Sequence, residues 1–295
     1  MASTPIDVVG PVGTVAPAGR IGRFLRRNLF LPVGAAIVLT FVLCALFPSV
    51  IAPRDPTRLD VVNQFTPPGP GHLLGTDEVG RDLFTRIVHG TRYSLGIAFA
   101  VVLIGASIGS LYGMLAGFVG GWVAEILMRI VDVFFSLPAF ILAMAIAAAM
   151  GPGVVSLMVA LVVIWWPGYA RMVRGMVLSI KERLHVEGAR ALGARPAYIM
   201  RRHIFPFMLK ELNVRVTQDM GYALVAVASL SFIGLGVRPP TPEWGLLLAG
   251  ARQYITGSWW YPLFPGLAIT IATLGFSLLG DALSELLGLD DGSER

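Results

Sequence analysis

The chain has 295 residues, of which 55% are hydrophobic and only 14% are charged. Soluble globular proteins carry about 25% charged residues, so this composition excludes an ordinary soluble domain and indicates an integral membrane protein. The net charge of +5 fits the orientation of a membrane protein, and we do not interpret it as nucleic-acid binding. Cys44, the single cysteine, excludes a disulfide framework and a cysteine metal site.

Several apolar segments are long enough to cross the hydrocarbon core of a bilayer, which is roughly 30 Å thick. One of these segments, residues 154–170, is short by itself. It continues toward Val177 across Arg171 and Arg174, whose charged groups can reach the lipid headgroups. The predicted fold class is therefore an all-α, polytopic membrane protein with about six transmembrane helices. The predicted spans are residues 29–51, 93–119, 133–155, 154–170, 220–237 and 255–280.

Lysine and arginine in the connecting segments indicate the orientation, because cytoplasmic segments are enriched in both. The N-terminal segment carries four arginines against one acid, and segment 171–215 carries ten basic residues against three acids. We therefore expect both to be cytoplasmic. The predicted organisation is a cytoplasmic tail (1–28), a first transmembrane helix (29–51), an extracytoplasmic loop (52–92), a core domain of five transmembrane helices (93–288) with a cytoplasmic loop (179–210), and a cytoplasmic tail (289–295).

The extracytoplasmic loop is expected to end in an interfacial helix. From Asp82 onward, Leu83, Phe84, Ile87 and Val88 fall at helical spacing. This helix would lead into the second span, either as an anchor on the membrane surface or as a docking element for an external partner.

The second span carries a glycine at every fourth position. Such a stripe lets another helix backbone approach closely, so we predict helix packing, with the wall of a translocation path as the alternative. Ser107 also lies between two of these glycines in a Gly-x-Ser-x-Gly pattern, but a serine nucleophile needs a base within reach. The four histidines all fall in predicted loops or at their edges, so we expect no catalysis there. The stripe consists of Gly105, Gly109, Gly113 and Gly117.

Charged residues gather at the predicted ends of two spans and are absent from the span interiors. An ion cluster of Glu125, Arg129 and Asp132 precedes the third span, and Arg215 and Asp219 enter the fifth. A secondary transporter commonly places ionisable groups inside the membrane, so this distribution argues against one.

A proline-stiffened outer loop, residues 237–245, is surrounded by aromatic residues. These aromatics predict an outer interfacial belt, with a substrate mouth or a docking surface for a binding protein as the alternative. They are Trp244, Tyr254, Trp259, Trp260 and Tyr261.

The cytoplasmic loop predicts two short helices that project from the bilayer. The first spans 182–192, with Leu184, Ala191 and Leu192 as its apolar members, and ends at Gly193, which suits a positive φ. Pro196 suits the first turn of the second helix, 197–205, which Pro206 then breaks. The small residues of the first helix would let it lie closely in a groove of a partner protein. The alternative is that the loop forms a basic helix on the surface of anionic lipid. The residues of this candidate docking element are Glu187, Gly188, Ala189, Arg190, Ala191, Leu192, Gly193, His203 and Pro206.

At this loop the chain resembles the permease subunits of binding-protein-dependent ABC importers. Glu187, Ala189, Gly193 and Pro206 fall at the offsets of the cytoplasmic signature of that family, with Gly188 in place of its middle alanine. Further segments resemble the C-type permease of dipeptide and oligopeptide importers and extend the resemblance over nearly the whole chain. They are residues 74–82, 128–132, 202–206, 235–245 and 279–283.

The resemblance implies a non-catalytic permease with the type I importer fold, in the inner or plasma membrane of a bacterium. Its implied partners are a second homologous permease, two ABC ATPase subunits that hold ATP and Mg²⁺, and an extracytoplasmic substrate-binding protein. This chain itself has no phosphate-binding Gly-x-x-x-x-Gly-Lys pattern, so we expect no cofactor or metal on it. The implied substrates are di- and oligopeptides; nickel chelates, glutathione and D-dipeptides, or a stand-alone secondary transporter, remain alternatives. No substrate-binding residue is predicted.

Overall fold

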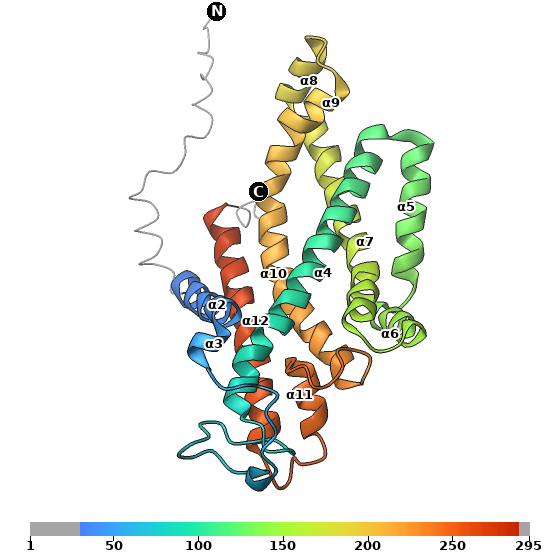
Figure 1. Cartoon of the computed structure of the whole chain (residues 1–295). Coiled ribbons are helices and arrows are strands. Elements are labelled where there is room, and N and C mark those ends of the chain that lie inside the picture. Colours follow the sequence, from blue (N-terminus) through green and yellow to red (C-terminus); the bar gives the residue numbers. More distant parts are fainter. Residues whose placement is uncertain (1–29, 289–295) are drawn as a thin grey trace, which may run out of the picture.

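The structure, a computed structural model of the chain, describes residues 30–288. Both predicted tails, with the arginines of the N-terminal segment, lie outside the described residues. Within 30–288 the chain forms helices joined by loops and contains no β-strand, which confirms the all-α prediction (Figure 1).

Three helices are long and apolar enough to span a membrane: α4 (Leu83–Val119), α7 (Val154–Lys181) and α12 (Trp260–Leu286). The bent pair α5 (Gly121–Ser136) and α6 (Ala139–Met150) adds a fourth span if it is counted as one. The shorter α2 (Phe30–Leu46) and the long but more polar α10 (Phe205–Phe232) lie where the first and fifth spans are predicted. The chain is thus a multi-pass helical protein, and the count of six spans stays a prediction.

The predicted third span, 133–155, is not one straight helix. The chain breaks at Leu137 and Pro138, and the axes of α5 and α6 differ by 86°. Leu137 is extended (φ −100°, ψ 140°) because the ring of a following proline disfavours the helical conformation. Pro138 also lacks the N–H that a continuing helix would need.

The predicted interfacial helix is not a separate element either. Residues 83–92 are the first turns of α4, which runs unbroken for 37 residues into the second span. Asp82 starts the helix, since its Oδ2 accepts a hydrogen bond from the Thr85 N–H at 3.0 Å. His89, expected at a loop edge, lies inside α4, with its Nε2 3.0 Å from the Ala52 carbonyl oxygen.

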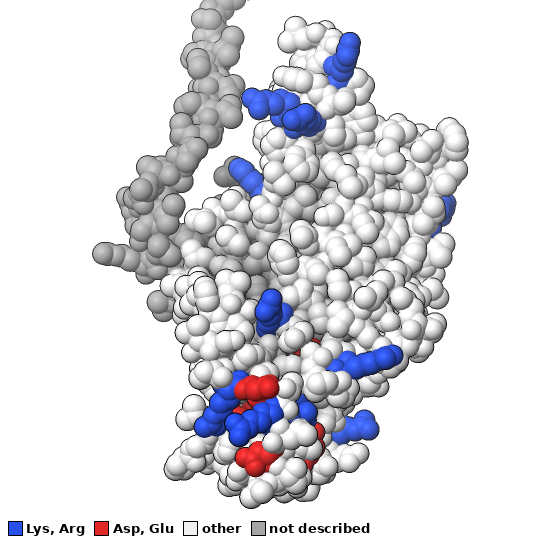
Figure 2. Space-filling model, in the orientation of Figure 1, with Lys and Arg blue, Asp and Glu red and all other residues white. Residues whose placement is uncertain are grey.

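The segment before α4, residues 52–82, folds as a cap over the ends of α4 and α12. Phe65 and Leu74 of this cap segment pack against Trp260 and Tyr261. The fully buried Asp77 stabilises the cap segment: it accepts a hydrogen bond from Arg81 Nε at 2.6 Å within the segment and another from Arg86 of α4. Figure 2 shows charges of both signs gathered at this end of the molecule.

The prediction of an outer aromatic belt is wrong for three of its five residues. Trp244, Trp260 and Tyr261 are buried, whereas Trp259 is exposed. The cap segment and α11 (Trp244–Ala251) cover these rings, and the indole N–H of Trp244 donates to the Ile87 carbonyl at 3.0 Å. The rings therefore act as core residues at this end of the bundle.

Glu243, which lies in the predicted outer loop, is fully buried as the N-cap of α11. Its carboxylate accepts hydrogen bonds from the N–H groups of Gly245 and Leu246, both at 2.9 Å. A third donor, the Ser94 hydroxyl of α4, lies 3.3 Å away. The carboxylate thereby ties α11 to α4.

Candidate functional site

Residues 179–210 form a projection at the end of the molecule opposite the cap segment. Helices α7 and α10 extend beyond the other long helices and carry α8 (Leu184–Ala191) and α9 (Pro196–Ile199) at their tip (Figure 1). The projection contains seven basic and two acidic residues. On the face seen in Figure 2 its charged groups are Lys and Arg.

The end of α8 has the local geometry expected from its sequence. Gly193 adopts φ +81°, which confirms the predicted left-handed turn. Its N–H donates to the Arg190 carbonyl at 3.0 Å, and the Ala194 N–H donates to the Ala189 carbonyl at 3.0 Å. These two bonds form a Schellman motif, so the glycine sets where the helix stops.

The second predicted helix does not break at Pro206. The chain stays helical from α9 through a π-helical turn, η2 (Met200–Ile204), into α10, where Pro206 occupies the first turn. The Phe205 N–H bonds to the Met200 carbonyl. In a regular α-helix the Pro206 ring would collide with the Arg202 carbonyl, and the wider π turn lies just before the proline, where it can relieve that collision.

An apolar core continues from α7 into the projection. Val186 of α8 is fully buried, together with Ile204 and Met208, and Ile199 is 3% exposed. These side chains pack against Ile180 near the end of α7. Because the core joins α8 and α9 to both long helices, the tip is held to α7 and α10 as one packed unit.

The outer face of the projection exposes apolar side chains. Leu184 is 86% exposed, Leu192 is 90% exposed and Tyr198 is 55% exposed. We expected Leu184 and Leu192 to be the apolar members of the first helix, but Val186 packs inward instead. Large apolar groups exposed at the tip of a projection are typical of a docking surface.

The predicted docking residues divide into an exposed set and a supporting set. Ala189 and His203 are half-buried, and the His203 ring centroid lies 5.7 Å from that of Tyr198 and 5.9 Å from that of His185. This aromatic contact joins the start of α8 to η2, and the sequence reasoning missed it because the partners lie far apart along the loop. The exposed set is Glu187, Gly188, Arg190, Ala191, Leu192, Gly193 and Pro206.

Gly188 lies in open space within this chain. A Cβ added there would meet no atom within 4 Å, so the packing of the chain itself does not require a glycine. The small side-chain volume at 188 leaves the α8 backbone accessible to another molecule.

The glycine stripe of α4 faces α7. A Cβ added to Gly109 would lie 2.3 Å from the Trp166 carbonyl oxygen, and one added to Gly113 would lie 2.4 Å from the Ala170 carbonyl oxygen. A Cβ added to Gly105 would lie 3.1 Å from the Trp165 Cβ, and one added to Gly117 would lie 2.8 Å from the Val177 Cβ. The backbones of α4 and α7 are therefore so close at these positions that only glycine fits without a shift of the helices.

Ser107 is not arranged as a nucleophile. Its hydroxyl donates to the Leu103 carbonyl of its own helix at 2.7 Å, and the side chain is exposed. No group of three or more potential metal ligands occurs within residues 30–288.

The predicted ion clusters are partly rearranged. Arg129 lies 3.7 Å from Glu125 as expected, but Asp132 pairs across helices with Arg171 of α7 at 2.7 Å. Asp219 pairs with Arg215 at 3.2 Å.

The position of Asp219 was predicted wrongly. Because α10 begins at Phe205, Asp219 lies in the middle of the helix, where it is 2% exposed and accepts a hydrogen bond from Trp165 Nε1 at 3.2 Å. The helix bundle does contain a buried carboxylate, so a lack of ionisable groups no longer argues against a secondary transporter. The assignment has to rest on other grounds.

Comparison with known proteins supplies those grounds. Residues 109–289 match the family described as binding-protein-dependent transport system inner membrane component. The chain is 39% identical over 271 residues to a protein of Escherichia coli described as a probable D,D-dipeptide transport system permease protein, covering 92% of this chain and 91% of the relative. It is 38% identical over 283 residues to a glutathione transport system permease protein of Shigella boydii serotype 4. This match covers 96% of this chain and 93% of the relative.

Proposed function

Because the chain belongs to the family of binding-protein-dependent transport system inner membrane components, we propose that it forms half of the translocation pathway of an ATP-driven importer of short peptides. The observation that carries the proposal is the packed projection with its exposed apolar and charged tip. Two relatives are named for the transport of D,D-dipeptides and of glutathione, both of which are small peptides. These names support short peptides as the substrate class. Nickel chelates stay the alternative substrate.

The partners in this proposal are a second, homologous permease, two ATPase subunits and an extracytoplasmic binding protein. ATP and Mg²⁺ would be held by the ATPase subunits, since this chain lacks the glycine-rich phosphate loop. The protein would lie in the bacterial inner membrane with both termini and the projection in the cytoplasm, in agreement with the basic character of residues 179–210.

The residues of the projection suggest how movement is transmitted. The exposed residues of α8 and its C-cap Leu192 would sit in a groove of one ATPase subunit, with Leu184 and Leu192 as apolar contacts and Glu187 as a charged contact. Movement of the ATPase would then displace α7 and α10 together, because Val186 and Ile204 pack the tip onto both helices. The close backbone contact at Gly109 would carry the displacement of α7 to α4.

Affinity capture tests the assembly. We expect the tagged chain, purified from native membranes in mild detergent, to retain a P-loop ATPase and a second permease that mass spectrometry identifies. A chain that is recovered alone, under conditions in which other ABC importers stay intact, would contradict the proposal.

A charge reversal tests the docking surface. Glu187→Arg places a cation at the proposed contact and should lower transport-coupled ATP hydrolysis by about tenfold or more, because like charges brought together at an interface cost several kcal/mol. The matched control is Glu211→Arg, which makes the same change at an exposed position on α10 outside the projection. Equal coupling in the two variants would exclude Glu187 from the contact.

A further inference from the structure

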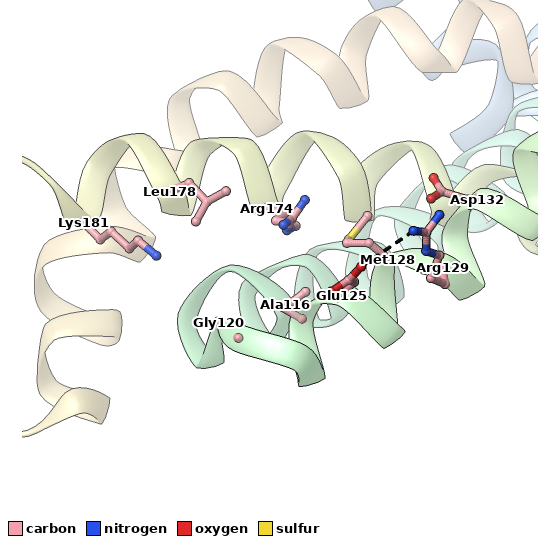
Figure 3. Close-up of a pocket in the computed structure, with 11 residues that line it drawn as sticks. Ala116, Gly120, Glu125, Met128, Arg129, Asp132, Arg174, Leu178 and Lys181 are labelled. Atoms are coloured by element: carbon pink, nitrogen blue, oxygen red, sulfur yellow. Dashed lines mark ion pairs between the residues drawn. The ribbon is translucent and has the colours of Figure 1, made fainter.

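A cavity of about 550 Å³ lies beside the base of the projection, between the end of α4, the helix α5 and the last turns of α7 (Figure 3). Gly120 and Gly121, both with positive φ, form the tight turn that joins α4 to α5 at its edge. Its lining combines apolar side chains such as Met128 and Leu178 with charged ones. The docking surface on α8 does not include it.

The acidic residues of this cavity are already neutralised. Glu125 pairs with Arg129 at 3.7 Å, and Asp132 pairs with Arg171 at 2.7 Å. The cavity therefore keeps two cations that have no carboxylate partner among residues 30–288, Arg174 and Lys181.

Arg174 and Lys181 have unused hydrogen-bonding capacity. The Nε of Arg174 is buried and has no hydrogen-bond acceptor within the described part of the chain. Lys181 Nζ reaches only the Gly117 carbonyl oxygen, at 3.5 Å, the outer limit for a hydrogen bond. The two residues are separated by two turns of α7, so both face the cavity from the same side of that helix.

A phosphate group matches this pair of cations. A guanidinium presents several N–H donors to phosphate oxygens, and an ammonium adds a point charge to the same anion. The outer surface of α5 beside the cavity is apolar, with Trp122 73% exposed and Ile126 51% exposed. A tryptophan at a helix end is typical of the membrane interface, where its ring lies at the level of the lipid headgroups.

We propose that this cavity binds the headgroup phosphate of an anionic phospholipid through Arg174 and Lys181. Basic pockets between transmembrane helices are known to hold anionic headgroups, and the apolar face of α5 would receive the chains of the same lipid. Lys181 is the last residue of α7, and α8 begins at Leu184. The bound lipid would thus join α4, α5 and α7 at the base of the projection. This inference requires only that the chain lies in a membrane and does not depend on the proposed transport function.

Native mass spectrometry of the purified chain, with whatever subunits accompany it, tests the site. The complex is titrated with dioleoylphosphatidylglycerol, and separately with dioleoylphosphatidylcholine. The test variant Arg174→Gln/Lys181→Gln should bind phosphatidylglycerol roughly 25-fold more weakly than the native protein, about fivefold for each cation removed. The charge-conserving variant Arg174→Lys/Lys181→Arg should stay within a few-fold of it. The matched control is Arg58→Gln/Arg252→Gln, which removes two cations outside the cavity.

The remaining outcomes would each overturn the inference. Equal lipid affinity in the test and control variants would place the lipid elsewhere. Equal binding of phosphatidylglycerol and phosphatidylcholine, or displacement of the bound lipid by inorganic phosphate, would show that the site does not select a membrane anion. Loss of a co-purified permease from the test variant alone, with lipid binding unchanged, would identify the cavity as a subunit interface.

Discussion

The packing of α4 on α7 makes a quantitative prediction for Gly109→Ala. The added Cβ would lie 2.3 Å from the Trp166 carbonyl oxygen and 2.6 Å from the Tyr169 Cβ. Ordinary contacts between such atoms are about 3.5 Å, so the helices would have to separate by about 1 Å. The neighbouring atom at the shortest contact belongs to backbone, which cannot turn away as a flexible side chain could.

The size of the effect follows from two opposing terms. Overpacking of this kind costs about 1–3 kcal/mol, whereas replacing glycine by alanine inside a helix gains about 1 kcal/mol. Gly96→Ala in the same helix isolates the first term, because a Cβ added at Gly96 meets no atom within 4 Å. The two variants should therefore differ in unfolding free energy by about 1–3 kcal/mol, with Gly96→Ala the more stable.

Thermal unfolding of the purified proteins in one detergent measures this difference. For a protein of this size 1 kcal/mol corresponds to about 2–4 °C, so the midpoints should lie about 2–12 °C apart. Gly113→Ala should behave like Gly109→Ala, because its Cβ would meet the Ala170 carbonyl oxygen at 2.4 Å. Gly105→Ala should be milder, with its closest contact at 3.1 Å. Equal midpoints for Gly96→Ala and Gly109→Ala would refute the close backbone contact.

Three further predictions concern local structure. Gly193→Val forces a β-branched residue to φ +81° and should lower the unfolding free energy by about 1–2 kcal/mol relative to Gly188→Val; equal melting temperatures would contradict this. Glu243→Ala removes the buried cap of α11 and should cost about 1–2 kcal/mol, seen as faster hydrogen exchange in α11, with Glu243→Gln retaining part of the protection. Burial by itself would raise the pKa of Asp82, but the hydrogen bonds with Thr85 and His72 and the charge of Arg54 together outweigh it and hold that pKa below its ordinary value. The ionised carboxylate then stabilises the fold above the unfolded-state pKa of about 3.9 and loses this effect as pH falls through the lower folded-state pKa. Asp82→Asn should accordingly be about 0.3–1 kcal/mol less stable at pH 7 and no less stable than the native protein at pH 2, and a constant difference between the two pH values would count against this mechanism.

The local features of the chain could be predicted from the sequence. Hydropathy predicted the long apolar helices α4, α7 and α12, because about twenty apolar residues in a row carry their own preference for lipid wherever they lie in the fold. The turn at Gly193 could also be predicted, since a positive φ depends on the residue and its neighbours in the sequence. The break at Pro138 could have been found by the same reasoning but was missed, because the apolar run across it hid a strong local signal.

Only the tertiary structure decided which residues are buried and paired. Trp260 has the sequence context of an interfacial aromatic, yet the cap segment covers it, because Thr76 far away in the chain accepts its indole N–H. The sequence predicted Asp219 at the end of a span, but α10 starts at Phe205 and places Asp219 in the middle of the helix. The pairing of Asp132 with Arg171, which leaves Arg174 without a carboxylate, likewise depends on how α5 lies against α7. Burial and ion pairing are properties of segments that folding brings together, and a pattern within one segment does not contain them.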